Sequence, residues 1–217
     1  MGFVIAVDGP AASGKGTVAA GLGRDLGYPV LDTGLLYRAV GWAVGQAGQD
    51  PDDEFAAMAA ARALEPGQLD NPRLRGREAG EAASRVAVHL GVRGALLAFQ
   101  REFAAREPGA VLDGRDIGTV IAPQAPAKLF VTASAPARAE RRWRQLCDQG
   151  ETVTLAEVRA DIQRRDERDS GRAAAPLIAA ADAVLLDTTQ MTISQAADAA
   201  RRIVEAARAR WEVSQTG

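Results

Sequence analysis

The stretch from Val4 to Thr17 reads VIAVDGPAASGKGT and guides the interpretation of the whole chain. An apolar run of strand length ends at Gly9, a loop of small residues follows, and Lys15 precedes a helical pattern that continues through Leu26. Small residues let the backbone approach phosphate oxygens, N–H groups at a helix start point at an anion, and the lysine adds a positive charge. The stretch therefore predicts a loop that binds a nucleoside triphosphate.

The predicted donor-binding residues form one segment: Gly9, Pro10, Ala11, Ala12, Ser13, Gly14, Lys15, Gly16 and Thr17. The pattern G-x-x-x-x-G-K-[ST] is met through Lys15, but Gly16 stands where the hydroxyl residue is expected and Thr17 follows it. A G-K-G-T ending resembles nucleoside-monophosphate kinases, in which water and phosphate hold more of the metal than side chains do. We expect ATP as phosphoryl donor with Mg²⁺, and Thr17 and Asp113 on the metal side, acting through water or phosphate.

Composition favours one α/β domain with small insertions. The chain has 217 residues, of which 47% are hydrophobic and 25% charged, and this is enough to bury a substantial core. The net charge of −2 argues against bulk nucleic-acid binding. One cysteine, Cys147, and one histidine, His89, argue against a disulfide framework or a Cys/His metal cluster. With neither an apolar run of membrane-spanning length nor a leader pattern, we expect a cytoplasmic protein that does not bind membranes.

Short apolar runs alternate with helical patterns along the chain. The predicted strands are Phe3–Val7, Pro29–Asp32, Ala110–Asp113, Ala127–Thr132 and Ala183–Asp187. This alternation indicates a five-stranded parallel sheet flanked by helices, of the phosphate-loop kinase type. Sites in such folds lie beyond the carboxyl ends of the strands, so the polar segments that follow the strands are expected to converge there.

The segment Leu31–Ala39, LDTGLLYRA, is the first candidate on the acceptor side. A strand ends here, Thr33 can cap the helix that follows, and Arg38 lies about one turn further along. Together they could hold a second phosphate, because the planar fork of arginine matches phosphate oxygens and a hydroxyl donates beside it. An ordinary capped amphipathic helix is the alternative.

Asp113 follows an apolar strand, at a position where a carboxylate can order metal-bound water, and Arg115 would reach the transferring phosphate. A structural ion pair between Arg115 and Asp116 is the alternative.

Further on, Arg165, Asp169 and Arg172 are spaced i, i+4, i+7 and share a face if the helix continues that far. A solvated, salt-bridged helix is the simpler interpretation, but beside a phosphate loop the row predicts a mobile, arginine-bearing lid.

Four segments are similar to those of bacterial cytidylate kinases: Leu31–Arg38, Asp113–Thr119 (DGRDIGT), Arg164–Asp169 (RRDERD) and Arg172–Leu177 (RAAAPL). The resemblance runs from the first strand to the last helix, and the segments occur in the same order. One region departs from the family pattern, because residues 49–76 are too short for the strand-rich insertion found there. We expect a single domain with a core (1–48, 86–137 and 173–213), an acceptor insertion (about 49–85) and a lid (about 138–172).

The resemblance implies roles for individual residues. It implies that Arg115 helps to hold the acceptor phosphate and that Asp116 lies on the nucleobase side. It also implies that Arg165 and Asp169 contact the acceptor ribose and phosphate, and that Arg172 contacts the base. Ser84 and Arg93 match positions that hold cytosine, and Tyr37 is counted with the acceptor-binding residues. We further expect Lys15, Arg115, Arg165 and Arg172 to act in catalysis. From their place after Ser134 and Pro136, at a predicted helix start, we also expect Arg138, Arg141 and Arg142 to serve the donor phosphates.

The resemblance implies transfer of the ATP γ-phosphoryl group to CMP, with dCMP as a further acceptor, by a monomer. The alternative enzyme function is that of another small phosphate-loop kinase acting on a different nucleotide or metabolite. A nucleotide switch or an RNA-binding regulator belongs to a different class, and neither an Asn-Lys-x-Asp guanine motif nor net basicity supports it.

Overall fold

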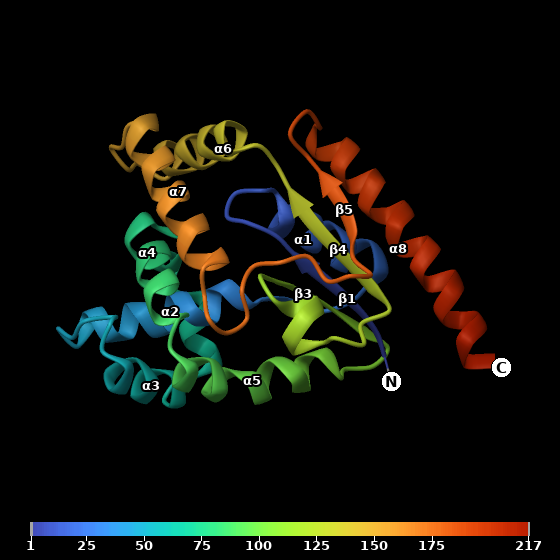
Figure 1. The fold of residues 1–217 in the computed structure, drawn as a ribbon, viewed down its shortest axis with the longest axis horizontal. Helices are drawn as coiled ribbons and strands as arrows, with labels where there is room; N and C mark the ends of the chain where they lie inside the picture. The colour runs from blue at the N-terminus through green and yellow to red at the C-terminus, as the bar shows by residue number, and fades with distance from the viewer. Residues whose placement is uncertain (1, 217) are drawn as a thin grey trace.

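The computed structural model describes residues 2–216 and contains one parallel sheet with helices on both faces (Figure 1). The strand order is β2-β3-β1-β4-β5, and every neighbouring pair is parallel. The strands are β1 (Phe3–Asp8), β2 (Val30–Asp32), β3 (Gly109–Gly114), β4 (Ala127–Thr132) and β5 (Val184–Asp187). Each boundary lies within one residue of the prediction, so the predicted fold class is confirmed.

Helices connect and cover the strands. They are α1 (Lys15–Leu26), α2 (Thr33–Gln46), α3 (Glu54–Arg62), α4 (Arg77–Val86), α5 (Leu90–Ala104), α6 (Ala135–Asp148), α7 (Leu155–Ser170) and α8 (Ile193–Thr216). Three short turns accompany them: the 3-10 turns η1 (Pro66–Asp70) and η2 (Pro72–Arg75), and the π-helical turn η3 (Ile117–Ile121). No single helix among residues 2–216 is long and apolar enough to cross a membrane, although α4 and α5, bent by 103°, meet that test as a pair.

The two faces of the sheet carry separate parts of the core. Alternate residues of a strand point to opposite faces, so Ile5 and Val7 of β1 pack with α1 and α8, whereas Val4 and Ala6 pack with α5 and η3. All four are at most 6% exposed. A sheet buried on both faces holds its strands rigidly, and this rigidity fixes where the loops beyond their carboxyl ends begin.

Two further clusters lie away from the sheet. One joins α2, α3, α4 and α5, and the second joins α6 to α7 through Leu146, Val158 and Ile162. Figure 1 shows α6 and α7 beyond the tips of the strands, with α4 beside α7, while the two termini lie at the opposite end of the sheet. Val92, Leu96, Phe99 and Phe103 repeat at helical spacing in α5. Val92, Leu96 and Phe103 are buried, and Phe99 is partly buried against the same core. The division of the chain into core, insertion and lid stays a prediction.

Candidate active site

The loop between β1 and α1, together with the first turn of α1, carries all nine predicted donor-binding residues, Gly9 to Thr17. Gly9 has a φ of +152°, and a Cβ there would lie 2.0 Å from the carbonyl oxygen of Val131. Gly14, with a φ of +90°, precedes α1 without any side-chain cap. Only glycine adopts such backbone without strain, and the first N–H groups of α1 have no intrahelical acceptor. The loop therefore presents free donors and the positive end of a helix to an anion.

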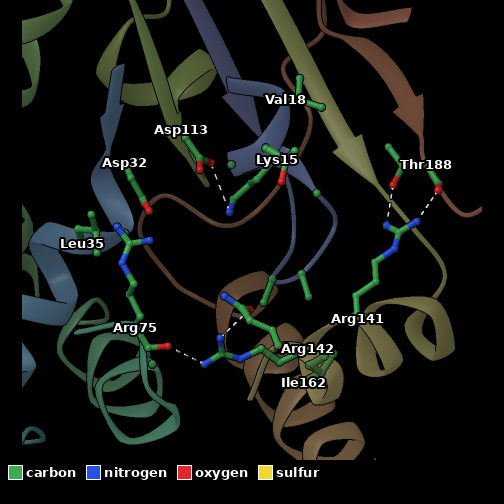
Figure 2. A pocket seen from close by; sticks show the side chains of 18 of the residues that line it. Lys15, Val18, Asp32, Leu35, Arg75, Asp113, Arg141, Arg142, Ile162 and Thr188 are labelled. Atoms are coloured by element: carbon green, nitrogen blue, oxygen red, sulfur yellow. Dashed lines mark hydrogen bonds and ion pairs between the residues drawn. The ribbon is translucent and has the colours of Figure 1, made fainter. Parts of the chain in front are cut away.

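A cleft of about 690 Å³ opens beside this loop (Figure 2). Its lining includes Lys15 at the start of α1 and Asp113 near the end of β3, with Lys15 Nζ 3.3 Å from Asp113 Oδ1. Burial lowers the pKa of Lys15 and raises that of Asp113 to about 6. A Cβ on Gly16 would lie 3.1 Å from Asp113 Oδ2. The glycine of the G-K-G-T ending thus lets the carboxylate sit close to the helix start.

Arginines from separate elements line the same cleft. They include Arg38 of α2, Arg115 after β3, Arg142 of α6 and Arg165 of α7. Burial, followed by repulsion from Arg142, lowers the pKa of Arg38 to about 10. Burial, followed by repulsion from Arg115, lowers that of Arg165 to about 9, and the buried Nε of Arg165 has no hydrogen-bond partner within residues 2–216. Clustered cations of this kind are stabilised when a polyanion enters the cleft.

Asp169, at the end of α7, joins several predicted acceptor residues. Its Oδ2 accepts from Arg115 Nε at 3.0 Å and lies 3.8 Å from Arg165 Nε, while its Oδ1 accepts from Arg172. Ser84 Oγ lies 3.5 Å from Oδ1. Burial acts to raise the pKa of Asp169, but the surrounding arginines outweigh it and lower the value to about 2. The carboxylate therefore stays charged and holds the arginines together.

A second ion pair lies beside this group. Arg93 of α5 pairs with Asp116, and its guanidinium is 5.9 Å from the centre of the Tyr37 ring. Asp116 is 5% exposed and Tyr37 is 8% exposed. The alternative pairing of Arg115 with Asp116 is wrong, because Arg115 pairs with Asp169 instead. Six residues predicted to bind the acceptor thus lie close together but outside the lining of the cleft: Tyr37, Ser84, Arg93, Asp116, Asp169 and Arg172.

Three local expectations need correction. Thr33 does not cap α2, because it is the first residue of that helix and its hydroxyl donates to the carbonyl oxygen of Asp113 at 2.9 Å. Helix α7 ends at Ser170, so Arg172 reaches Asp169 from the following loop rather than from a continued helix. Arg138 does not line the cleft, and its guanidinium forms a bidentate pair with Asp166.

Other cleft residues were not singled out from the sequence. Arg75 lies in η2 and lines the cleft, and Figure 2 shows its side chain directed toward Asp32 and Leu35. Thr188, after β5, donates to the carbonyl oxygen of Ser13 at 2.8 Å, and Arg141 donates to both Oγ1 and the carbonyl of Thr188. Arg73 and Arg75, just before α4, were the available signal, but without periodicity they indicated no surface.

Comparison with known proteins places this geometry in one family. The profile of the cytidylate kinase family matches residues 5–206. The chain belongs to the cytidylate kinase family. It is 68% identical to the cytidylate kinase of Caulobacter sp. (strain K31), over 97% of this chain and 98% of that protein. The cytidylate kinases of Caulobacter vibrioides (strain NA1000 / CB15N) and Xanthobacter autotrophicus are 67% and 62% identical, over 97% and 95% of this chain and 99% of each relative.

Membership of the cytidylate kinase family confirms the resemblance that the four sequence segments indicated. The matches cover nearly all of this chain and of each relative. This chain, including residues 49–76, therefore has the ordinary length of these relatives. Those residues contain α3, η1 and η2 and no strand. The roles of individual site residues remain proposals.

Proposed function

We propose that the chain transfers the γ-phosphoryl group of ATP to the phosphate of CMP, giving CDP and ADP. The observation that carries the proposal is the cleft that gathers Lys15, Arg38, Arg115 and Arg165 from four parts of the fold. The family match supports CMP as acceptor and ATP as donor. Buried cations on several sides of one cleft favour two phosphorylated substrates over a neutral ligand.

The transfer requires positioning and charge, not a protein nucleophile. An oxygen of the CMP phosphate bonds to the γ-phosphorus while the bond from that phosphorus to the β,γ-bridging oxygen breaks, and the bridging oxygen leaves with ADP. Lys15 and the backbone N–H groups at the start of α1 hold the donor phosphates. Arg38 and Arg115 hold the acceptor phosphate, and the Thr33 hydroxyl joins them by giving up its bond to the carbonyl oxygen of Asp113. Arg165 and Arg172 neutralise charge on the transferring group, an interaction that becomes stronger where bound substrates displace water from the cleft.

The residues present fit a magnesium ion that phosphates and water largely hold. Thr17 and Asp113 both line the cleft beside Lys15, whereas residues 2–216 offer no cluster of three His, Cys, Asp or Glu side chains suited to a metal. Mg²⁺ usually keeps several waters and binds one or two carboxylates plus substrate phosphates. When bound, it would neutralise charge on the donor phosphates, with Asp113 and Thr17 ordering its water.

Cytosine selectivity is assigned to the buried group around Asp116. Arginines such as Arg93 donate to O2 and N3 of cytosine, whereas Ser84 and Asp116 accept from its amino group. Uracil carries an N–H at position 3 and a carbonyl at position 4, so it would leave buried polar groups unpaired. Because Arg93 and Asp116 now pair with each other, CMP binding has to replace part of that contact. We also propose that dCMP is accepted, and that the protein is a cytoplasmic monomer that binds neither membranes nor nucleic acid.

A coupled assay of ADP release with CMP, dCMP, UMP, AMP and shikimate tests the proposal. We expect the highest kcat/KM with CMP, measurable turnover of dCMP, and at least about tenfold lower kcat/KM with UMP, since unpaired polar groups discriminate strongly. Equal rates with UMP would reject the cytosine pocket. Turnover of AMP or shikimate without turnover of CMP would favour the runner-up, a phosphate-loop kinase for another acceptor.

A further inference from the structure

Asp8 is the last residue of β1 and directly precedes the donor-binding loop. It is 5% exposed and is not among the residues that line the cleft. Each of its carboxylate oxygens accepts one backbone N–H: Oδ1 from Ile117 and Oδ2 from Gly118, both at 2.8 Å. A buried carboxylate that matches two consecutive amides forms a strong, directional contact.

The two amides have no alternative acceptor in their own turn. Ile117 and Gly118 begin η3, and the first N–H groups of a helical turn lack an intrahelical partner. Within η3, the carbonyl oxygen of Asp116 accepts from Val120 at 2.9 Å and from Ile121 at 3.2 Å. Asp8 therefore satisfies buried donors that would otherwise cost free energy.

Residues 114–116 connect β3 to η3, and they carry two groups of the acceptor side. Arg115 pairs with Asp169, and Asp116 pairs with Arg93. The register of β1 against β3 fixes one end of this connection, since Asp8 lies opposite Gly114. The carboxylate of Asp8 fixes its other end.

The packing around this contact is tight. A Cβ on Gly118 would lie 3.1 Å from Lys128 Cδ and 3.3 Å from Asp8 Oδ2. Burial raises the pKa of Asp8 to about 6, the two amides act to lower it, and the nearby charges of Asp116 and Asp113 raise it further. Burial of a carboxylate costs free energy, so we expect one that stays buried here to hold its partners in position.

We propose that Asp8 is a positioning residue for the phosphoryl acceptor: by binding the N–H groups of Ile117 and Gly118, it sets the direction in which Arg115 and Asp116 leave β3. This inference rests on the proposed function, because Arg115 and Asp116 are the groups assigned to CMP. Asp8 touches neither substrate. Its loss should therefore affect the acceptor and leave the donor nearly unchanged.

Asp8→Asn tests the role, because asparagine keeps the shape and one accepting oxygen but turns an NH₂ group toward the second amide. We expect kcat/KM for CMP to fall about tenfold or more, the preference for CMP over UMP to shrink, and the Kd of ATP from calorimetry to stay within about twofold. Amide hydrogen exchange at Ile117 and Gly118 should accelerate. Asp25→Asn, which loses a surface pair with Arg201, is the matched control and should change none of these quantities.

A folded Asp8→Asn protein with wild-type kcat/KM for CMP and wild-type selectivity would overturn the inference. Equal losses of ATP binding and CMP turnover would also overturn it, since they indicate a general structural role. If Asp8→Asn does not fold, Gly118→Ala displaces the same contact from the other side, and the same criteria apply to it. Absence of CMP turnover in the wild-type protein would instead reject the proposed function, while amide exchange would still report on the contact of Asp8.

Discussion

Lys15 is one of very few lysines in a chain whose basic residues are almost all arginine. Lys15 and Lys128 are the only lysines among 26 basic residues. A compact ammonium on a flexible stem can follow the β- and γ-phosphates as a point charge, whereas a guanidinium is a planar fork with fixed donor directions. The position of Lys15, 3.3 Å from Asp113 and at the start of α1, supports its proposed role beside the donor phosphates.

Replacement of Lys15 by methionine should lower kcat by about 10² to 10³, comparable to the loss of one charge-stabilising donor in other enzymes. Methionine has a similar length, so circular dichroism and the midpoint of thermal unfolding should stay close to wild type. Arg201→Met, which removes a surface cation, is the control and should turn over normally. Wild-type turnover by Lys15→Met would contradict the assigned role.

The raised pKa of Asp113 predicts how the stability of the protein depends on pH. Burial raises its pKa from 3.8 to about 6, so the folded protein holds this proton more tightly than the unfolded chain does. The contribution of Asp113 to stability is therefore greatest below pH 4 and falls as pH rises from about 4 to 6, by an amount on the order of 3 kcal/mol. Asp169 has the opposite sign: with a pKa lowered to about 2, it stabilises above pH 4 and loses that contribution as pH falls toward 2.

Urea unfolding at pH 4.5 and pH 7 measures this effect in wild type and Asp113→Asn. Between pH 4.5 and pH 7, the wild-type protein should lose more of its stability than the variant does, because asparagine cannot titrate. Parallel pH profiles for the two proteins would show that Asp113 ionises in the folded state as it does in the unfolded chain.

At the scale of elements, the sequence predicts those features, such as helix starts, that depend on residues close together along the chain. Thr154/Glu157 and Thr192/Gln195 have the sequence spacing of a capping box, and they form the starts of α7 and α8. Gly14 likewise ends the loop before α1 in the left-handed conformation that glycine permits. The partners of the arginines could not be predicted in this way. Arg115 bonds Asp169 across 54 residues, and this pairing depends on how α7 docks rather than on local spacing. Arg172 likewise reaches Asp169 only because the chain turns after α7.

Arg138 shows how α6 and α7 are tied to the donor loop. Its Nε donates to the carbonyl oxygen of Ala133, and Nη1 donates to that of Ala11 at 3.3 Å. The same guanidinium forms a bidentate pair with Asp166 of α7. One buried side chain thus joins α6, the loop that binds the donor and the helix that carries Arg165.

Arg138→Lys should therefore lower kcat/KM about tenfold and stability by about 2 kcal/mol, because an ammonium cannot serve the fork geometry. Steady-state kinetics and urea unfolding measure the two effects. Arg144→Lys, in an exposed pair with Glu140 on the outside of α6, is the matched control and should be neutral. If Arg138→Lys matched wild type in both assays, charge alone would account for the contact.

Over the whole molecule, contacts independent of substrate join the two sides of the cleft. Arg77 of α4 pairs with Asp161 of α7, Arg168 of α7 pairs with Glu81 of α4, and Arg142 donates to the backbone of η2. Figure 1 shows α4 and α7 side by side in agreement with these pairs. Closure over the cleft is thus favoured by the protein's own charges before any nucleotide binds.

Breaking these pairs should open the substrate-free protein. We expect the double variant Glu81→Gln/Asp161→Asn to have a larger radius of gyration by small-angle X-ray scattering, because neither pair between α4 and α7 remains, and ATP with CMP should restore the wild-type value. Wild type should approach the variant as salt rises, since partly exposed pairs are screened. Asp25→Asn removes an ion pair between α1 and α8 and should leave the scattering unchanged. Identical curves for the double variant and wild type at low salt would mean that apolar packing, not charge, holds α4 against α7.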